Sequence, residues 1–210
     1  MSSARSAKVR VFIDFWNFSK SWEGLTGLLP EENLDWAEFP GAILDGLDQI
    51  PLIRNVQKEL RAVKVYASVK PADFFTSRRN SEREVDEERR RHEWLTNHLD
   101  QLTAYAVDVT VQANRTQRCY VCDHDTGQVF EQGVDTKIAI DLVSLASRHL
   151  YDIAVLVTDD QDLVPSTQCV QEALQKKVVH LGVKKLQKSD VQLEAWGHLH
   201  VDDMLSRIAL

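Results

Sequence analysis

Apolar and polar positions along the chain form patterns that predict parallel strands separated by helices. Residues 8–14 alternate and then become continuously apolar, and residues 153–158 form a fully apolar run. A run of that kind is typical of a strand buried on both faces of a sheet. Strand patterns also occur at 62–69, 105–111, 177–181 and, in a short form, near 199–201.

The segments between these strands carry helical patterns. Residues 80–102 and 136–150 have apolar positions close to the 3.6-residue period of an amphipathic helix. Short helices broken by prolines are expected over 15–60, and the clearest is 36–50, with Pro40 in its first turn or before it. Two further helices are predicted: one covers 163–175, and the other begins at Asp202.

Strands and helices in this order predict an α/β fold, a Rossmann-like central parallel sheet with helices on both faces. We expect the whole chain, 1–210, to form a single domain. The tripeptide at 125–127, Asp-Thr-Gly, predicts a hairpin turn within a small insertion around 115–132. Residues 190–210 are expected to form a C-terminal helical extension.

Composition and charge narrow the class of protein. Hydrophobic residues at 43% and charged residues at 27% are ordinary for a globular protein and exclude a fibrous or disordered one. Without an apolar run of ~20 residues or an apolar leader, we expect no membrane association. Three cysteines favour a reducing, cytoplasmic location. The net charge of −7 argues against binding nucleic acid through bulk positive charge but leaves room for local basic patches.

Aspartates stand where two of the predicted strands end. Asp14 ends the first strand and is followed by Asn17, while Thr158, Asp160 and Asp162 lie at the end of the apolar run. If these strands are neighbours, their carboxylates converge at the carboxyl edge of the sheet, where α/β proteins bind ligands. Crowded carboxylates repel one another, and a bound divalent cation such as Mg²⁺ or Mn²⁺ usually neutralises that repulsion.

A helix adds two more acids, and each aspartate has an ordinary alternative role. Asp135 opens the helix at 136–150, and Asp141 lies six positions further on. Any of the strand-end or helix-start aspartates could simply cap a helix. Asp141 could instead pair with Lys137, four residues before it.

Three blocks of the sequence resemble the signature motifs of the NYN-domain family, PIN-like ribonucleases that include the bacterial LabA-like proteins. The blocks are VFIDFWNF at 11–18, GVDTKIAIDL at 133–142 and YDIAVLVTDDQDLVP at 151–165. They occur in the family's order, and the similarity covers about residues 9–183.

The resemblance implies a metal-dependent endoribonuclease that uses Mg²⁺ or Mn²⁺ to hydrolyse RNA and leaves a 5′-phosphate. It matches Asp14, Asp135 and Asp160 to catalytic, metal-holding acids and adds Asp162 as a metal ligand. Supporting roles fall to Asn17, Asp141 and Thr158. Asp159 departs from the pattern, since the family usually has Gly there, so a non-catalytic RNA-binding or regulatory module is the alternative function.

Weaker signals concern RNA contacts and zinc. Arg78 and Arg79 follow two phenylalanines and are candidate RNA contacts, as are Lys184 and Lys185, although an ordinary lysine-rich surface is the more common explanation for the lysines. Cys119 and Cys122 form half of a zinc motif, and without a second pair we expect a hairpin without zinc. Whether the chain forms a homodimer is left open by the sequence.

Overall fold

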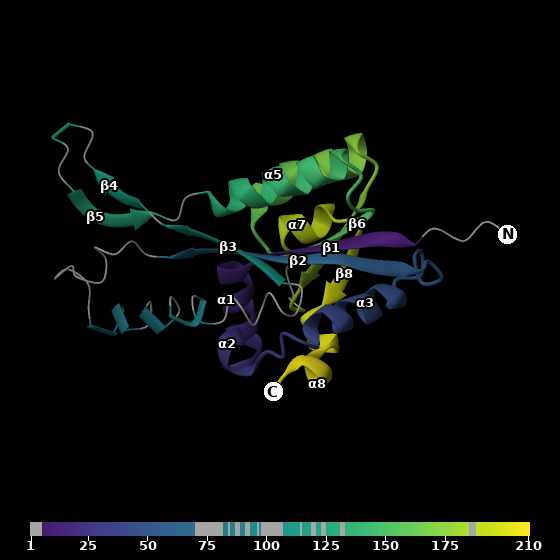
Figure 1. Cartoon of the computed structure of the whole chain (residues 1–210), viewed down its shortest axis with the longest axis horizontal. Coiled ribbons are helices and arrows are strands. Elements are labelled where there is room, and N and C mark those ends of the chain that lie inside the picture. The colour runs from purple at the N-terminus through teal and green to yellow at the C-terminus, as the bar shows by residue number, and fades with distance from the viewer. Residues whose placement is uncertain are drawn as a thin grey trace.

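In the computed structural model of the chain, six strands form one sheet in the order β3-β2-β1-β6-β7-β8 (Figure 1). Every neighbouring pair is parallel. The strands of this sheet are β1 (Ala7–Asp14), β2 (Lys58–Val69), β3 (Val107–Ala113), β6 (Ile153–Val157), β7 (Lys177–Gly182) and β8 (Gly197–His200). The predicted α/β fold with a parallel sheet is confirmed.

The structure describes residues 6–69, 82–83, 85–86, 89–90, 93–95, 97, 107–113, 115–118, 121–122, 125–130, 133–184 and 188–210. The α-helices are α1 (Phe15–Thr26), α2 (Pro30–Asn33), α3 (Phe39–Gln49), α5 (Val134–Ser147), α6 (Val164–Gln168), α7 (Asp190–Glu194) and α8 (Leu205–Ile208). The described positions within the predicted helix at 80–102 are helical. Among all the described residues, no helix is long and apolar enough to cross a membrane.

Helices cover both faces of the sheet, as its sequence requires. All five residues of β6 are buried, which is possible only when both faces are covered. Successive residues of β1 enter different cores: Val11 and Ile13 pack with α1 and α3, and Phe12 packs with α5. In Figure 1, α5 and α7 lie on one side of the sheet, and α1, α2, α3 and α8 lie on the other.

The predicted helix at 163–175 is present, but it changes type along its length. A 3₁₀ turn (Gln161–Leu163) leads into α6, and a π-helix (Cys169–Ala173) follows. Pro165 lies in the first turn of α6, where its missing N–H has no intrahelical partner to lose. The π-helical turn is closed by the Leu174 N–H, which donates to the Cys169 carbonyl five residues earlier.

The hairpin is present, but the predicted position of its turn is wrong. Strands β4 (Arg115–Arg118) and β5 (Asp125–Phe130) pair antiparallel, with Arg118 opposite Asp125. Residues 125–127 therefore belong to β5, and the connection lies before them. Pairing along the strands, which includes Thr116 opposite Val129, outweighs the local turn preference of Asp-Thr-Gly. This hairpin lies apart from the six-stranded sheet (Figure 1).

Candidate metal centre

The site begins where β1 ends and α1 starts. Asp14 is the last residue of β1 and the N-cap of α1, where its Oδ1 accepts a hydrogen bond from the Asn17 N–H at 3.2 Å. The side-chain oxygen of Asn17 accepts in turn from the Asp159 N–H at 2.9 Å. Asp14 is only 5% exposed. The first turn of α1 is thereby tied to the segment that follows β6.

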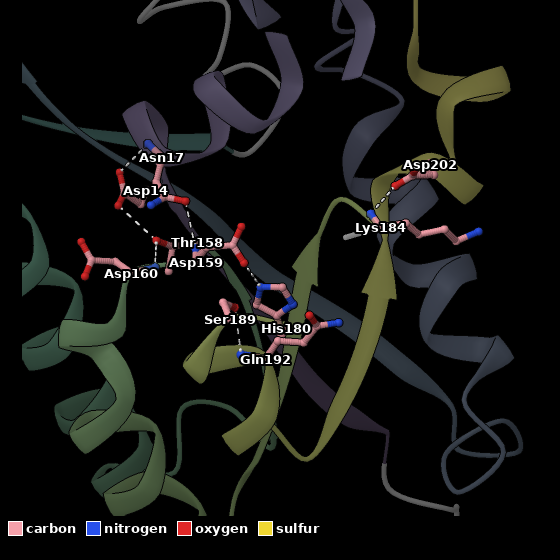
Figure 2. Close-up of polar contacts among 10 residues, drawn as sticks. All are labelled: Asp14, Asn17, Thr158, Asp159, Asp160, His180, Lys184, Ser189, Gln192 and Asp202. Carbon is pink, nitrogen blue, oxygen red and sulfur yellow. Dashed lines mark hydrogen bonds and ion pairs between the residues drawn. The ribbon is translucent and has the colours of Figure 1, made fainter. Parts of the chain in front are cut away.

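That segment, residues 158–162, carries the second acid (Figure 2). The buried Thr158 hydroxyl donates to Asp14 Oδ2 at 3.2 Å and accepts from the Asp160 N–H at 3.1 Å. Asp160 caps the following 3₁₀ turn, because its Oδ1 accepts from the Asp162 N–H at 2.9 Å. Strands β1 and β6 are adjacent and parallel, so both acids lie at the same edge of the sheet.

The third acid comes from the start of α5. Asp135 is the second residue of that helix, in a first turn where the helix dipole favours a carboxylate. Carboxylate oxygens of Asp14, Asp135 and Asp160 all lie within 4.8 Å of one another. Asp14 and Asp160 are therefore helix caps and members of a carboxylate group at once, and the two roles expected as alternatives coexist.

This group fits a divalent cation by both distance and donor chemistry. Mg²⁺ and Mn²⁺ prefer oxygen ligands, and oxygens bound to one ion at about 2–2.5 Å can be no more than about 4–5 Å apart. The three carboxylates meet that limit. Their mutual repulsion also favours a positive charge between them. We call Asp14, Asp135 and Asp160 the carboxylate triad.

Asp141 has a different environment. Its carboxylate accepts from Lys137 Nζ at 2.9 Å, from Lys64 Nζ at 3.1 Å and from the Tyr66 hydroxyl at 2.9 Å. Burial raises the pKa of Asp141, but the hydrogen bonds from Lys137, Lys64 and Tyr66 outweigh it, so the pKa lies below its usual value. The structure does not bring Asp141 into the triad. Instead, Asp141 forms the i,i+4 pair with Lys137 and links α5 to β2.

The other candidate residues lie outside the triad or outside the described residues. The exposed Asp162 contributes its backbone N–H to Asp160, and its carboxylate is not part of the triad. In Figure 2, Lys184 lies apart from Asp14 and Asp160, and its backbone N–H donates to Asp202. Its Nζ pairs with Asp203 at 2.5 Å. Cys122 is exposed and has a free thiol. The candidates outside the described residues are Arg78, Arg79, Lys185 and Cys119.

Sequence reasoning missed one polar contact beside the triad. His180, on β7, is 1% exposed, and its Nε2 lies 3.1 Å from Asp159 Oδ1. A histidine at a buried position of the apolar pattern KVVHLG was the available signal. Asp159 itself does not have the positive φ that would suit glycine.

A cavity of about 530 Å³ lies elsewhere, between α3 and β8. Its lining includes Asp45, His198 and Arg207, and it shares no residue with the triad. The Arg207 guanidinium already forms ion pairs with Glu38 and Asp45, so its charge is neutralised within the protein and is not available to an anionic ligand.

Comparison with known proteins supports this assignment of fold and family. A crystal structure of a protein of unknown function from Vibrio parahaemolyticus aligns over 100% of both chains, with 20% identity and a TM-score of 0.60, and shows a shared fold. A Listeria monocytogenes protein described as a UDP-N-acetylglucosamine 2-epimerase aligns with 93% of this chain and 39% of its own, at 12% identity and a TM-score of 0.41, too weak to support an argument. No curated protein matches the sequence. The NYN-domain model matches residues 8–197, and the chain therefore belongs to the NYN-domain family of PIN-like nucleases.

Proposed function

We propose that this protein is a metal-dependent endoribonuclease that hydrolyses RNA phosphodiester bonds at the carboxylate triad. The observation that carries the proposal is the meeting of three carboxylates, from three separate segments, within 4.8 Å of one another. Such a group is costly to assemble unless a cation or a substrate uses it. Family membership supports a nuclease.

The triad residues Asp14, Asp135 and Asp160 would hold Mg²⁺ or Mn²⁺ through their carboxylate oxygens. A divalent ion bound there supplies Lewis acidity that activates water and stabilises the leaving oxygen. Thr158 and Asn17 orient the acids: Thr158 bonds Asp14 and the Asp160 N–H, and Asn17 fixes the backbone at Asp159. The role of these two residues is positional.

The retained triad supports catalysis over the alternative of a non-catalytic RNA-binding module. That alternative rests on Asp159 in place of the family's usual glycine. Because Asp159 has an ordinary φ and an ordered side-chain contact with His180, the replacement does not strain the backbone beside Asp160.

The direct test is cleavage of labelled single-stranded and structured RNA in Mn²⁺, Mg²⁺ or chelator. We expect metal-dependent cuts that leave 5′-phosphates, abolished in Asp14→Asn. Asp35→Asn is a matched control, because Asp35 also caps backbone N–H groups, those of Ala37 and Glu38, and is not part of the triad. RNA that is bound but not cut by the wild type in either metal would favour the non-catalytic alternative.

A further inference from the structure

His180 is a polar residue buried in a strand whose neighbouring positions are apolar. The ionised Asp159 carboxylate can only accept a hydrogen bond, so His180 Nε2 donates to it. In the neutral ring, Nδ1 is then an acceptor, and it is buried with no hydrogen-bond partner among the described residues. Leaving a buried polar atom unpaired lowers the stability of the fold. Packing alone does not account for a histidine here.

The fold makes room for this ring at the carboxyl end of β7. His180 and Gly182 lie two positions apart and so share one face of the strand. A Cβ on Gly182 would lie 2.5 Å from His180 Cε1 and 3.1 Å from Nε2. Any side chain at 182 would therefore displace the imidazole, and the glycine permits the ring to extend toward Asp159.

The contact with His180 holds Asp159, the residue between Thr158 and Asp160, in place. The backbone N–H of Asp159 donates to Asn17 on α1, and its side chain accepts from His180 on β7. Asp159 is thus held both by α1 and by β7. Thr158, the residue before it, donates to Asp14 and accepts from the N–H of Asp160, the residue after it (Figure 2).

We propose that His180 is a positioning residue for the metal site: through Asp159 it fixes the turn at 158–160 so that Asp160 meets Asp14 and Asp135. Gly182 supports the same arrangement, because it leaves the space that the His180 ring fills. The inference rests on the proposed function in one respect only, the cation at the triad. The ordering of the turn is a property of the protein without metal.

The test uses His180→Leu, which removes the donor and the unpaired nitrogen together. Amide hydrogen exchange at Asp159 and Asp160, followed by NMR in chelator, should become roughly tenfold faster because the turn opens more often. Mn²⁺ affinity, measured by calorimetry, should fall about 10–100-fold, the range for removing a group that orients a metal ligand. The melting temperature in chelator should change little, because the loss of the hydrogen bond to Asp159 is offset by the removal of the unpaired Nδ1.

Three further variants separate positioning from general loss of stability. His180→Gln keeps a side-chain N–H donor and should recover exchange rates and Mn²⁺ affinity toward the wild type. Gly182→Ala should reproduce the His180→Leu result by displacing the ring. Tyr151→Phe is the control: it removes a buried hydrogen bond to the Leu142 carbonyl, so it should lower the melting temperature and leave Mn²⁺ affinity intact.

The outcomes distinguish this inference from the proposed function. Wild-type exchange rates and Mn²⁺ affinity in His180→Leu would overturn the positioning role, and so would faster exchange with unchanged affinity. An equal loss of affinity in Tyr151→Phe would reduce the effect to general destabilisation and also overturn it. If the wild type itself binds no Mn²⁺, the proposed function fails, and exchange at Asp159 and Asp160 still decides whether His180 orders the turn.

Discussion

The two carboxylate oxygens of Asp14 have different partners, one in helix α1 and one in the segment that carries Asp160. Its Oδ1 caps α1 through the Asn17 N–H, whereas Oδ2 accepts from Thr158. A capping role needs only an acceptor, which asparagine also provides. A role in binding a cation needs the negative charge as well. Substitutions at this one position can therefore separate the two roles.

We predict opposite effects of two Asp14 substitutions on stability. Asp14→Ala removes the cap and should lower the free energy of unfolding in chelator by about 0.5–2 kcal/mol. Asp14→Asn keeps the cap and relieves repulsion within the triad, so in chelator it should be neutral or stabilising by about 0.5–2 kcal/mol. Urea denaturation with and without Mn²⁺ measures both, and only the wild type should gain stability from the metal. A full Mn²⁺ effect in Asp14→Asn would place the cation elsewhere.

Asp141 leads to a prediction about pH. Because its pKa in the folded protein lies below its usual value of 3.8, its ion pairs stabilise the fold above that value. Their contribution should be lost as the pH falls from 3.8 through the lowered folded-state pKa. Urea midpoints of the wild type and Asp141→Asn should thus differ by a constant amount from neutral pH to about pH 5 and converge at lower pH. A difference that grows on acidification would contradict the assigned ion pairs.

Helix α5 places Asp135 in the triad through the geometry of its first residues. Gly133, the N-cap, has φ 90°, a conformation that side chains rarely adopt. The chain turns there directly into the helix, so Asp135 falls in its first turn. Six residues further along the helix, Asp141 anchors α5 to Lys64 and Tyr66 of β2. One helix thus carries both Asp135 of the triad and the residue that anchors the helix to β2.

We expect Gly133→Ala to cost about 1–2 kcal/mol of stability, because an L-residue is strained at positive φ. It should also weaken Mn²⁺ binding, since relieving that strain moves the start of α5. The matched control is Gly24→Ala, at an exposed position within α1 where an added Cβ meets nothing within 4 Å. That substitution should stabilise by about 0.5–1 kcal/mol. Equal melting temperatures and Mn²⁺ affinities for the two variants would refute the role given to Gly133.

Elements with strong local patterns could be predicted from the sequence, and contacts between elements could not. The apolar run at 153–158 identifies a strand buried on both faces, and the order of strands gives the parallel sheet. The hairpin turn was misplaced because its position depends on cross-strand pairing. Asp141 could not be assigned from spacing alone, since its partners Lys64 and Tyr66 are more than 70 residues away in sequence. His180 was missed for the same reason: Asp159 lies on another strand's end, 21 residues away.

The molecule as a whole is acidic, with a net charge of −7, and its site is made of acids. RNA therefore meets repulsion unless cations at the triad and local basic residues offset it. We interpret the chain as one NYN domain in which the β4–β5 hairpin is an insertion and the segment after residue 190 extends the sheet with β8. In that arrangement RNA would be held near the carboxyl edge of the sheet.

The salt dependence of RNA binding tests where those basic residues are. If Arg78 and Arg79 neutralise phosphates, replacing both with Ala should weaken single-stranded RNA binding. The slope of log K against log[salt] should flatten by roughly 1.4, about 0.7 for each phosphate that is no longer neutralised. Arg54 and Arg61 are the matched control pair, because both are exposed and lie near the amino end of β2, opposite the triad. Replacing them should leave the slope unchanged.

Binding is measured by fluorescence anisotropy of a labelled RNA with Asp14→Asn as the background, so that cleavage does not interfere. Equal slopes in the two double variants would mean that Arg78 and Arg79 are merely solvated, and Lys184 and Lys185 would then be the remaining candidate RNA contacts. Lys184 is paired with Asp203, so recruiting it to RNA would require breaking that pair. Replacing Lys184 should therefore flatten the slope of log K against log[salt] by less than the value of about 0.7 expected for a residue that neutralises one phosphate.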